Sequence, residues 1–139
     1  MPCIDDPGIA DDDDLWRRIP PDWVILDENL DVEAGGRVRP ASVAFRDPEL
    51  SVLLAREDNP ERALAGYRQK GFSLAAIKTG QARELRQIVC RKPTLEDRSH
   101  LHVEGNKKKL RVDEALALAA EWVGPTPPPT KTKARNKGR

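Results

Sequence analysis

Two histidines and a glutamate stand at alternate positions, His100, His102 and Glu104. If this stretch is a strand, the three side chains point to one face, because successive side chains of a strand alternate between faces. Imidazole and carboxylate groups placed this way could bind a metal ion or transfer protons. The chain has no other histidine, and its two cysteines lack the spacing of metal ligands. We therefore expect no metal, and His100 and His102 are the candidate ligands if one binds.

A glycine turn with three lysines follows directly and could bind an anion. We call it the 105–109 loop; it consists of Gly105, Asn106, Lys107, Lys108 and Lys109. A helix is expected to begin here, and the unpaired N–H groups of a helix N-terminus attract phosphate groups and acidic side chains. The plain alternative is a solvated run of charge. The phosphate-binding motif GxxxxGK[ST] is absent.

Arginines and serines provide the remaining candidates. A basic cluster would form if the first and third expected strands pair, and its members would be Arg17, Arg18, Arg37 and Arg39. Ser42 and Ser51 are the best-placed hydroxyls, but neither stands in the GxSxG motif of a nucleophilic serine. Ordinary surface charge is the alternative for the arginines.

Apolar patterns predict the elements that would position these residues. Strands are expected at residues 15–19, 37–45, 50–55, 72–78 and 100–103, and a strand or buried loop at 23–26. One helix should run from an Asn59 cap to Gly71, and another over 110–123, while 82–90 could be helix or strand. This order predicts a single small α+β domain, with a mixed or antiparallel sheet packed by two or three helices.

The two ends differ sharply in charge. Residues 1–14 carry six aspartates and no basic residue, and residues 124–139 carry five cations and no acid. We expect a disordered acidic segment at 1–14, a folded domain at 15–124, and a proline-rich linker with a disordered basic tail at 125–139. The tail could bind nucleic acid weakly through phosphate contacts.

Composition limits the location of the protein. The chain contains no apolar run of the roughly 20 residues that a membrane span needs, so we expect no membrane association. Its N-terminus lacks the basic and apolar regions of a secretory signal. Cys3 and Cys90 are expected to be free thiols, as in a reducing compartment. These features together predict a cytoplasmic protein.

Several segments together resemble short bacterial proteins to which we attach no activity. They are Leu15–Pro20 (LWRRIP), Arg39–Phe45 (RPASVAF), Leu50–Val52 (LSV), His100–Gly105 (HLHVEG) and the alanine-rich stretch that ends at Trp122 and Val123. The resemblance spans most of residues 15–123 and implies a single bacterial domain.

A second resemblance concerns the arginine of the first strand and the later strand that combines arginine, serine and an aromatic residue. This arrangement is similar to small ADP-ribosyltransferase-like toxins of the RES type. It implies that Arg17 contacts a nicotinamide dinucleotide and that Ser42 lines the pocket. The late acidic catalytic residue has no clear counterpart, so Glu104 or Glu121 would have to serve. In an enzyme, the candidate catalytic residues would be Arg17, Ser42, His102 and Glu104.

The function expected from these observations is binding. We expect a non-catalytic or accessory intracellular protein that binds a protein partner or a phosphate-bearing ligand, without a cofactor. The alternatives are a small nucleotide- or NAD-using enzyme of the ADP-ribosyltransferase-like class, and weak nucleic-acid binding through the tail. Convergence of Arg17, Ser42, His100 and His102 in one pocket would favour a ligand site or an enzyme, and their scatter would favour an interaction protein.

Overall fold

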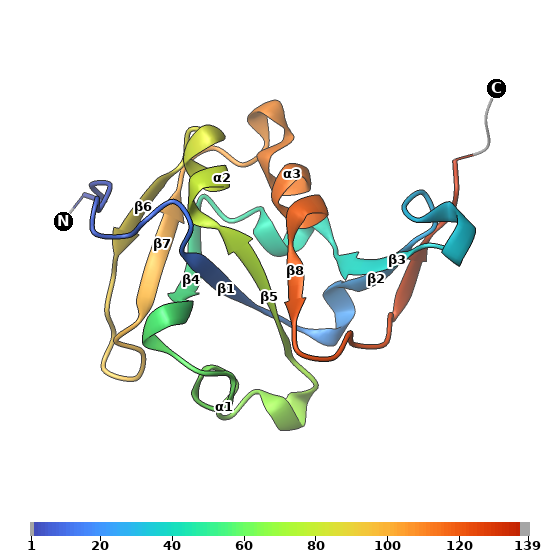
Figure 1. Ribbon diagram of the computed structural model, residues 1–139, viewed down its shortest axis with the longest axis horizontal. Helices are drawn as coiled ribbons and strands as arrows, with labels where there is room; N and C mark the ends of the chain where they lie inside the picture. Colours follow the sequence, from blue (N-terminus) through green and yellow to red (C-terminus); the bar gives the residue numbers. More distant parts are fainter. Residues whose placement is uncertain (1, 137–139) are drawn as a thin grey trace.

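Alternating apolar residues build a six-stranded antiparallel sheet at the centre of the computed structural model, which describes residues 2–136 (Figure 1). The strand order is β6-β7-β4-β1-β5-β8. The strands are β1 (Asp14–Ile19), β4 (Glu49–Leu54), β5 (Ser73–Lys78), β6 (Ile88–Arg91), β7 (His100–Glu104) and β8 (Glu121–Val123). The strands predicted at 15–19, 50–55, 72–78 and 100–103 are confirmed to within one residue at each end. The α+β fold class is likewise confirmed.

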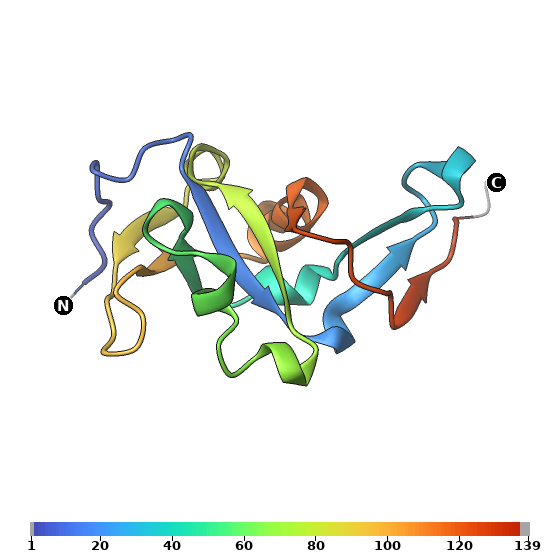
Figure 2. The same cartoon turned by 60° about the horizontal axis from the view of Figure 1, so that its bottom comes forward.

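A second, three-stranded sheet lies at the end of the molecule away from β6 (Figure 2). Its order is β3-β2-β9, formed by β3 (Arg37–Pro40), β2 (Val24–Asp27) and β9 (Lys131–Lys133). Arg39 Nε donates to Asp27 Oδ2 at 2.9 Å, and both side chains are 3% exposed. Burial alone would raise the pKa of Asp27, but hydrogen bonds from Arg39 and Asn29 hold it below its usual value.

The basic cluster predicted from Arg17, Arg18, Arg37 and Arg39 does not form. The prediction required the first and third strands to pair, but β1 and β3 belong to different sheets. The expected extended stretch 37–45 also ends early, because Ser42–Phe45 is a 3₁₀ turn that buries Phe45.

The helices are shorter than their sequence signals suggest. They are α1 (Pro60–Ala63), α2 (Thr79–Glu84) and α3 (Val112–Ala119). Asn59 caps α1 as predicted, since its side chain accepts a hydrogen bond from the Arg62 amide at 2.9 Å. α1 ends at Ala63, so the predicted helix does not continue to Gly71. Beyond it, Gly66 adopts the left-handed conformation at φ 80°, which is incompatible with a continuing right-handed helix.

In the stretches 82–90 and 110–123 the helix also ends early and a strand follows it. The ambiguous stretch 82–90 is both helix and strand, since α2 ends at Glu84 and β6 begins at Ile88. The last predicted helix stops at Ala119, and Trp122 instead lies on β8, where it faces Ala75 of β5. Its indole Nε1 donates to the Val38 carbonyl at 2.9 Å and so joins the two sheets.

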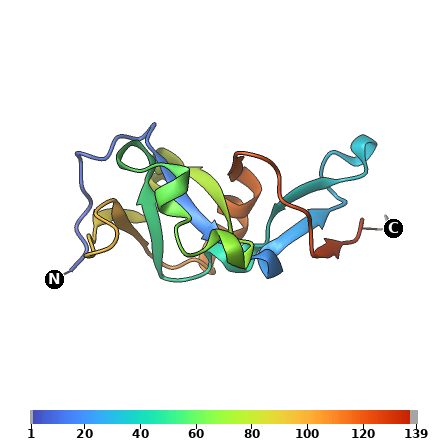
Figure 3. The same cartoon turned by 90° about the horizontal axis from the view of Figure 1, so that it is seen from below.

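Each face of the large sheet has its own apolar cluster. The main core lies on the face covered by α2 and α3, and it includes Leu15, Phe45, Ile77, Leu101 and Leu116. A smaller cluster lies on the opposite face under α1 and consists of Leu53, Ala63, Leu64 and Leu74, with Trp16, Tyr67, Phe72 and Val123 at its border. Figure 3 shows α1 and the segment that follows it on this second face. Among the described residues, no helix is long and apolar enough to cross a membrane.

The acidic N-terminal segment packs on the domain, in contrast to the predicted disorder of residues 1–14. Ile9 is fully buried in the main core. Arginines of the domain pair with four of the aspartates: Arg83 with Asp5 at 3.2 Å and Asp11 at 2.7 Å, Arg91 with Asp6 at 3.3 Å, and Arg56 with Asp13 at 3.0 Å. The mutual repulsion that suggested disorder is therefore offset by cations that are distant in sequence.

Cys3 and Cys90 form a disulfide, so the prediction of two free thiols is wrong. The two residues are separated by 87 positions, and sequence spacing gave no sign of their proximity. Asp6 N donates to the Val89 carbonyl at 2.8 Å, which places this end of the chain along β6 and Cys3 beside Cys90.

The basic tail also forms structure where it is described. Thr130 N donates to the Val24 carbonyl at 2.9 Å, and β9 then pairs with β2 in parallel. Lys131, Lys133 and Arg135 are exposed. Lys137 and Arg139, which complete the five expected tail cations, lie outside the described residues.

The buried N-terminal segment gives a stability prediction. Replacing Ile9, which is 0% exposed, with alanine should lower the free energy of unfolding by about 2–5 kcal/mol, because it leaves a cavity in the main core. The matched variant Ile4→Ala removes a side chain that is 75% exposed and should change stability by less than about 0.5 kcal/mol. Denaturant unfolding of both variants measures the difference. Equal, small effects would show that the segment does not contribute to the core.

Candidate functional site

A cavity opens where two neighbouring strands of the large sheet diverge. β1 pairs with β5 over its full length, from Asp14 to Ile19, but its register with β4 covers only Leu15 and Trp16. Beyond Trp16, β4 continues with β7 as its partner. The next residues of β1, Arg17 and Arg18, therefore stand at the opening between β1 and β4. We call the space there the β1–β4 cavity.

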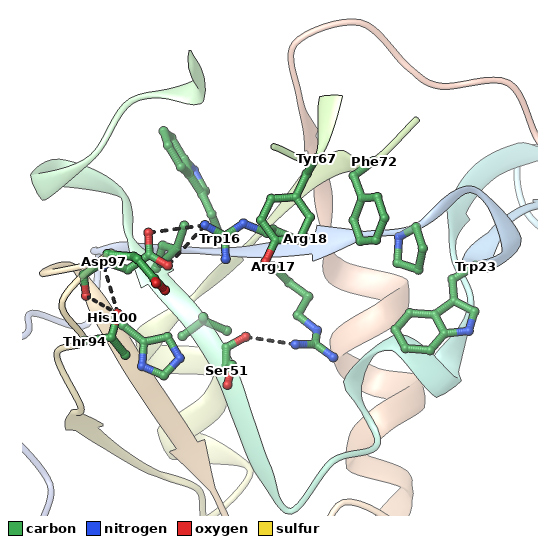
Figure 4. A pocket seen from close by; sticks show the side chains of 14 residues that line it. Trp16, Arg17, Arg18, Trp23, Ser51, Tyr67, Phe72, Thr94, Asp97 and His100 are labelled. Carbon is green, nitrogen blue, oxygen red and sulfur yellow. Dashed lines mark hydrogen bonds and ion pairs between the residues drawn. The ribbon is translucent and has the colours of Figure 1, made fainter. Parts of the chain in front are cut away.

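Arg17 fills part of this opening with its guanidinium group. Nε donates to the Ala44 carbonyl at 2.9 Å, and Nη1 donates to the Ser51 carbonyl at 3.1 Å. The guanidinium carbon lies 6.0 Å from the centroid of the Trp23 ring (Figure 4). Nη2 makes no hydrogen bond to any described residue, and no carboxylate of those residues lies within ion-pair distance. Burial lowers the pKa of Arg17 and the nearby charge of Asp47 opposes this shift in part, but an arginine keeps its charge at neutral pH.

Arg18 points to the opposite face of the sheet and forms an ion pair there. Its Nε donates to the Ala63 carbonyl at 2.6 Å, and Nη2 contacts both carboxylate oxygens of Asp97 at 3.3 Å. The guanidinium carbon lies 4.4 Å from the Tyr67 ring centroid, which permits a cation–π interaction. Tyr67 in turn packs against Phe72, with ring centroids 5.1 Å apart. Arg18 therefore joins β1, α1 and the loop that carries Asp97 into one wall of the cavity.

A tight loop between β6 and β7 supplies the wall opposite the aromatic residues. Thr94 Oγ1 accepts from the Asp97 amide at 2.8 Å, and the His100 amide donates to the Asp97 carbonyl at 3.2 Å. The ring atom Nδ1 of His100 lies 2.6 Å from the Lys92 carbonyl. A carbonyl can only accept, so Nδ1 carries the proton, and Nε2 of the neutral ring is an acceptor.

The β1–β4 cavity has a volume of about 480 Å³, which lies in the range of small-molecule sites. Its lining combines two arginines, two carboxylates, one imidazole and four aromatic rings: Arg17, Arg18, Glu96, Asp97, His100, Trp16, Trp23, Tyr67 and Phe72. Asp97 is occupied by Arg18, whereas no carboxylate of the described residues makes a contact ion pair with Arg17, and Asp47 acts on it only as a nearby charge. The cavity can therefore accept a negative charge at Arg17 and a flat ring beside the aromatic side chains.

The residues predicted to form a site do not all meet. Arg17 and His100 line the β1–β4 cavity, as does Ser51. Ser42 lies on the 3₁₀ turn and is absent from the lining. His102 and Glu104 share the face of His100, as their spacing predicted, but Nδ1 of His102 lies 2.9 Å from Oε2 of Glu104 and both lie outside the cavity.

The 105–109 loop lies at the other end of β7 and is largely occupied by its own contacts. Lys107 is 1% exposed, and its Nζ donates to the carbonyls of Val103, Gly105 and Pro48 at 2.8, 3.1 and 3.2 Å. Asn106 Oδ1 accepts from the amides of Lys108 and Lys109 at 3.0 and 2.9 Å. The N–H groups of Gly105, Lys108 and Lys109 and the Lys107 ammonium group are thus satisfied within the protein, while the side chains of Asn106, Lys108 and Lys109 remain exposed.

Comparison of the chain with protein-family models, with curated proteins and with solved structures finds no match. The assignment of the candidate site is therefore supported by its geometry alone. Sequence reasoning missed the aromatic wall and Asp97, because Trp16, Tyr67 and Phe72 have the pattern of core residues, and Asp97 lies in a polar loop. The only available signal was the adjacent Trp16, Arg17 and Arg18, which combine an aromatic ring with two cations on one strand.

Lys107 gives a pH prediction. Burial lowers its pKa to about 8, below the value of about 10.4 for an unfolded chain. Between these values the unfolded state binds more protons, so the free energy of unfolding should rise with pH, by at most about 1.4 kcal/mol per pH unit. In Lys107→Met this rise in the free energy of unfolding should be absent, while other titrating groups should contribute equally to both proteins. Urea unfolding between pH 7 and 10.5 measures both profiles, and parallel profiles would show that Lys107 remains charged throughout.

Proposed function

We propose that this protein binds a small phosphate-bearing ligand with a flat ring, of the nucleotide class, in the β1–β4 cavity. The observation that carries the proposal is the half-buried Arg17 guanidinium, which lines the cavity and makes no contact ion pair among residues 2–136, with Asp47 as a more distant charge. A partly buried cation with no carboxylate in direct contact favours the binding of an anion. Arginine also suits a phosphate group in particular, because its planar fork can donate two parallel hydrogen bonds.

The walls of the cavity support the ring of such a ligand. Trp23 lies beside Arg17, and Phe72 lies beside Tyr67, so aromatic surface flanks the charged group on one side (Figure 4). Stacking on aromatic side chains is a common way to bind a base. His100 Nε2 and the Ser51 side chain offer polar contacts on the other side. This arrangement favours the ligand-binding form of the expected function over binding of a protein partner.

A second candidate function is the NAD-using enzyme. It is favoured by the presence of Glu96, Asp97 and His100 in the same cavity as Arg17, since these groups could transfer protons or stabilise a developing positive charge. The catalytic acid would then come from the loop of residues 92–99, because Glu104 lies outside the cavity lining. Ser42, expected to line the pocket, lies outside it as well. Release of nicotinamide from NAD by the purified protein would support this reading.

The proposal predicts a ligand preference that depends on Arg17. Isothermal titration should show binding of AMP or ADP, weaker binding of inorganic phosphate, and little binding of adenosine, which lacks the charge. Arg17→Gln should weaken nucleotide binding at least tenfold, since a hydrogen bond to a charged group contributes about 1.5–3 kcal/mol. Arg17→Lys should recover only part of the affinity, because lysine lacks the planar fork.

The control variant is Arg68→Gln, which removes an exposed arginine outside the cavity lining. It should leave nucleotide affinity unchanged. Circular dichroism of Arg17→Gln must match the parent spectrum, since Arg17 also joins Ser51 to Ala44. Equal binding by the parent and Arg17→Gln would contradict the proposal, and so would equal affinities for AMP and adenosine.

A further inference from the structure

A group of metal-ligand side chains surrounds the disulfide, away from the β1–β4 cavity. The sulfur atoms of Cys3 and Cys90 and a carboxylate oxygen of Glu104 all lie within 4.8 Å of one another. The imidazole of His102 extends the group, because its Nδ1 lies 2.9 Å from Oε2 of Glu104. Cys90 and His102 are direct partners across β6 and β7, so their positions are fixed by the sheet register.

We propose that the reduced chain binds a zinc ion through Cys3, Cys90, Glu104 and His102, and that disulfide formation removes this site. Two thiolates, an imidazole and a carboxylate are all ligands that Zn²⁺ accepts in a four-coordinate site. Soft thiolates also select zinc over magnesium or calcium. In the oxidised chain the two sulfur atoms are bonded to each other and are no longer thiolates. The structure shows this oxidised form.

Contacts other than the disulfide hold Cys3 in place, so reduction would not release it. Asp6 N donates to the Val89 carbonyl at 2.8 Å, and Asp5 Oδ1 accepts from the Val89 amide at 3.0 Å. The ion pairs of Asp5 and Asp6 with Arg83 and Arg91 fix the same segment. Farther along, fully buried Ile9 anchors it in the core. The two thiols would therefore remain close, and small rotations of the side chains would bring four ligand atoms around one ion.

The chemistry balances with a dithiol as reductant. The dithiol transfers two electrons and two protons to the Cys3–Cys90 disulfide, whose S–S bond breaks, and the reductant closes into its own cyclic disulfide. Zinc then displaces one proton from each thiol, because the thiolate is the metal ligand. Reoxidation in the presence of a disulfide oxidant expels the ion and restores the Cys3–Cys90 bond.

Zinc titration of the full chain in its two redox states tests the proposal. The protein is reduced with dithiothreitol, freed of it without oxygen, and titrated with Zn²⁺ in competition with a chromophoric chelator. The reduced chain should bind one equivalent at least 100-fold more tightly than the oxidised chain. Cobalt(II), bound in place of zinc, should give the intense near-ultraviolet absorption of thiolate-to-metal charge transfer. This measurement needs no variant.

Variants assign the ligands. Cys3→Ser, Cys90→Ser, Glu104→Gln and His102→Ala should each weaken zinc binding by the reduced chain at least tenfold. Glu33→Gln is the matched control for Glu104→Gln, since Glu33 is exposed on the Val32–Ala34 turn and outside both ligand groups, and it should bind zinc like the parent. Equal affinity of the oxidised and reduced chains would overturn the proposal and indicate the other ligand group, Glu49, His102 and Glu104. Absence of binding in both states would overturn it as well.

Discussion

The divergence of β1 from β4 is the constraint on which the rest of this structure depends. β1 is the central strand that keeps β5 as a partner along its length, but it leaves β4 after Trp16. Two strands that separate leave backbone groups without partners, and such groups are costly when buried. Arg17 provides part of the missing hydrogen bonding, because its side chain donates to the Ser51 carbonyl of β4 and also to the Ala44 carbonyl in the 3₁₀ turn. The same divergence creates the cavity and places a cation in it.

The large sheet carries its main core on one face and most of its polar candidate residues on the other, with Arg17 as an exception on the core face. The face under α2 and α3 carries the main apolar core, where Leu15 faces Leu54 across β1 and β4, and Val52 faces Leu101 across β4 and β7. The other face carries polar residues in a row, and α1 covers only part of it. At one end of that face lies His100, at the wall of the β1–β4 cavity. At the other end lies Glu104, beside the cysteines.

Sequence patterns predicted the strands well because alternation depends only on neighbouring residues. The cap of α1 at Asn59 was visible for the same reason. The patterns failed where a distant partner decides the outcome. Pairing of Asp5 with Arg83 and of Cys3 with Cys90 depends on how the chain folds back along β6. The site was predicted in part, since Arg17 and His100 line one cavity, while Ser42 and His102 of the same hypothesis lie outside it. Lys107 turned inward to backbone carbonyls that no motif reveals.

The coverage of the sheet edges has a consequence for association between molecules. An open edge strand offers unpaired N–H and C=O groups to a second chain and can begin aggregation. At the β6 edge, both outward backbone groups of Val89 are already bonded to the acidic segment, through Asp5 and Asp6. The other edge is β8, which is only three residues long. A second molecule would therefore have to displace the acidic segment before its own strand could pair with β6 at Val89.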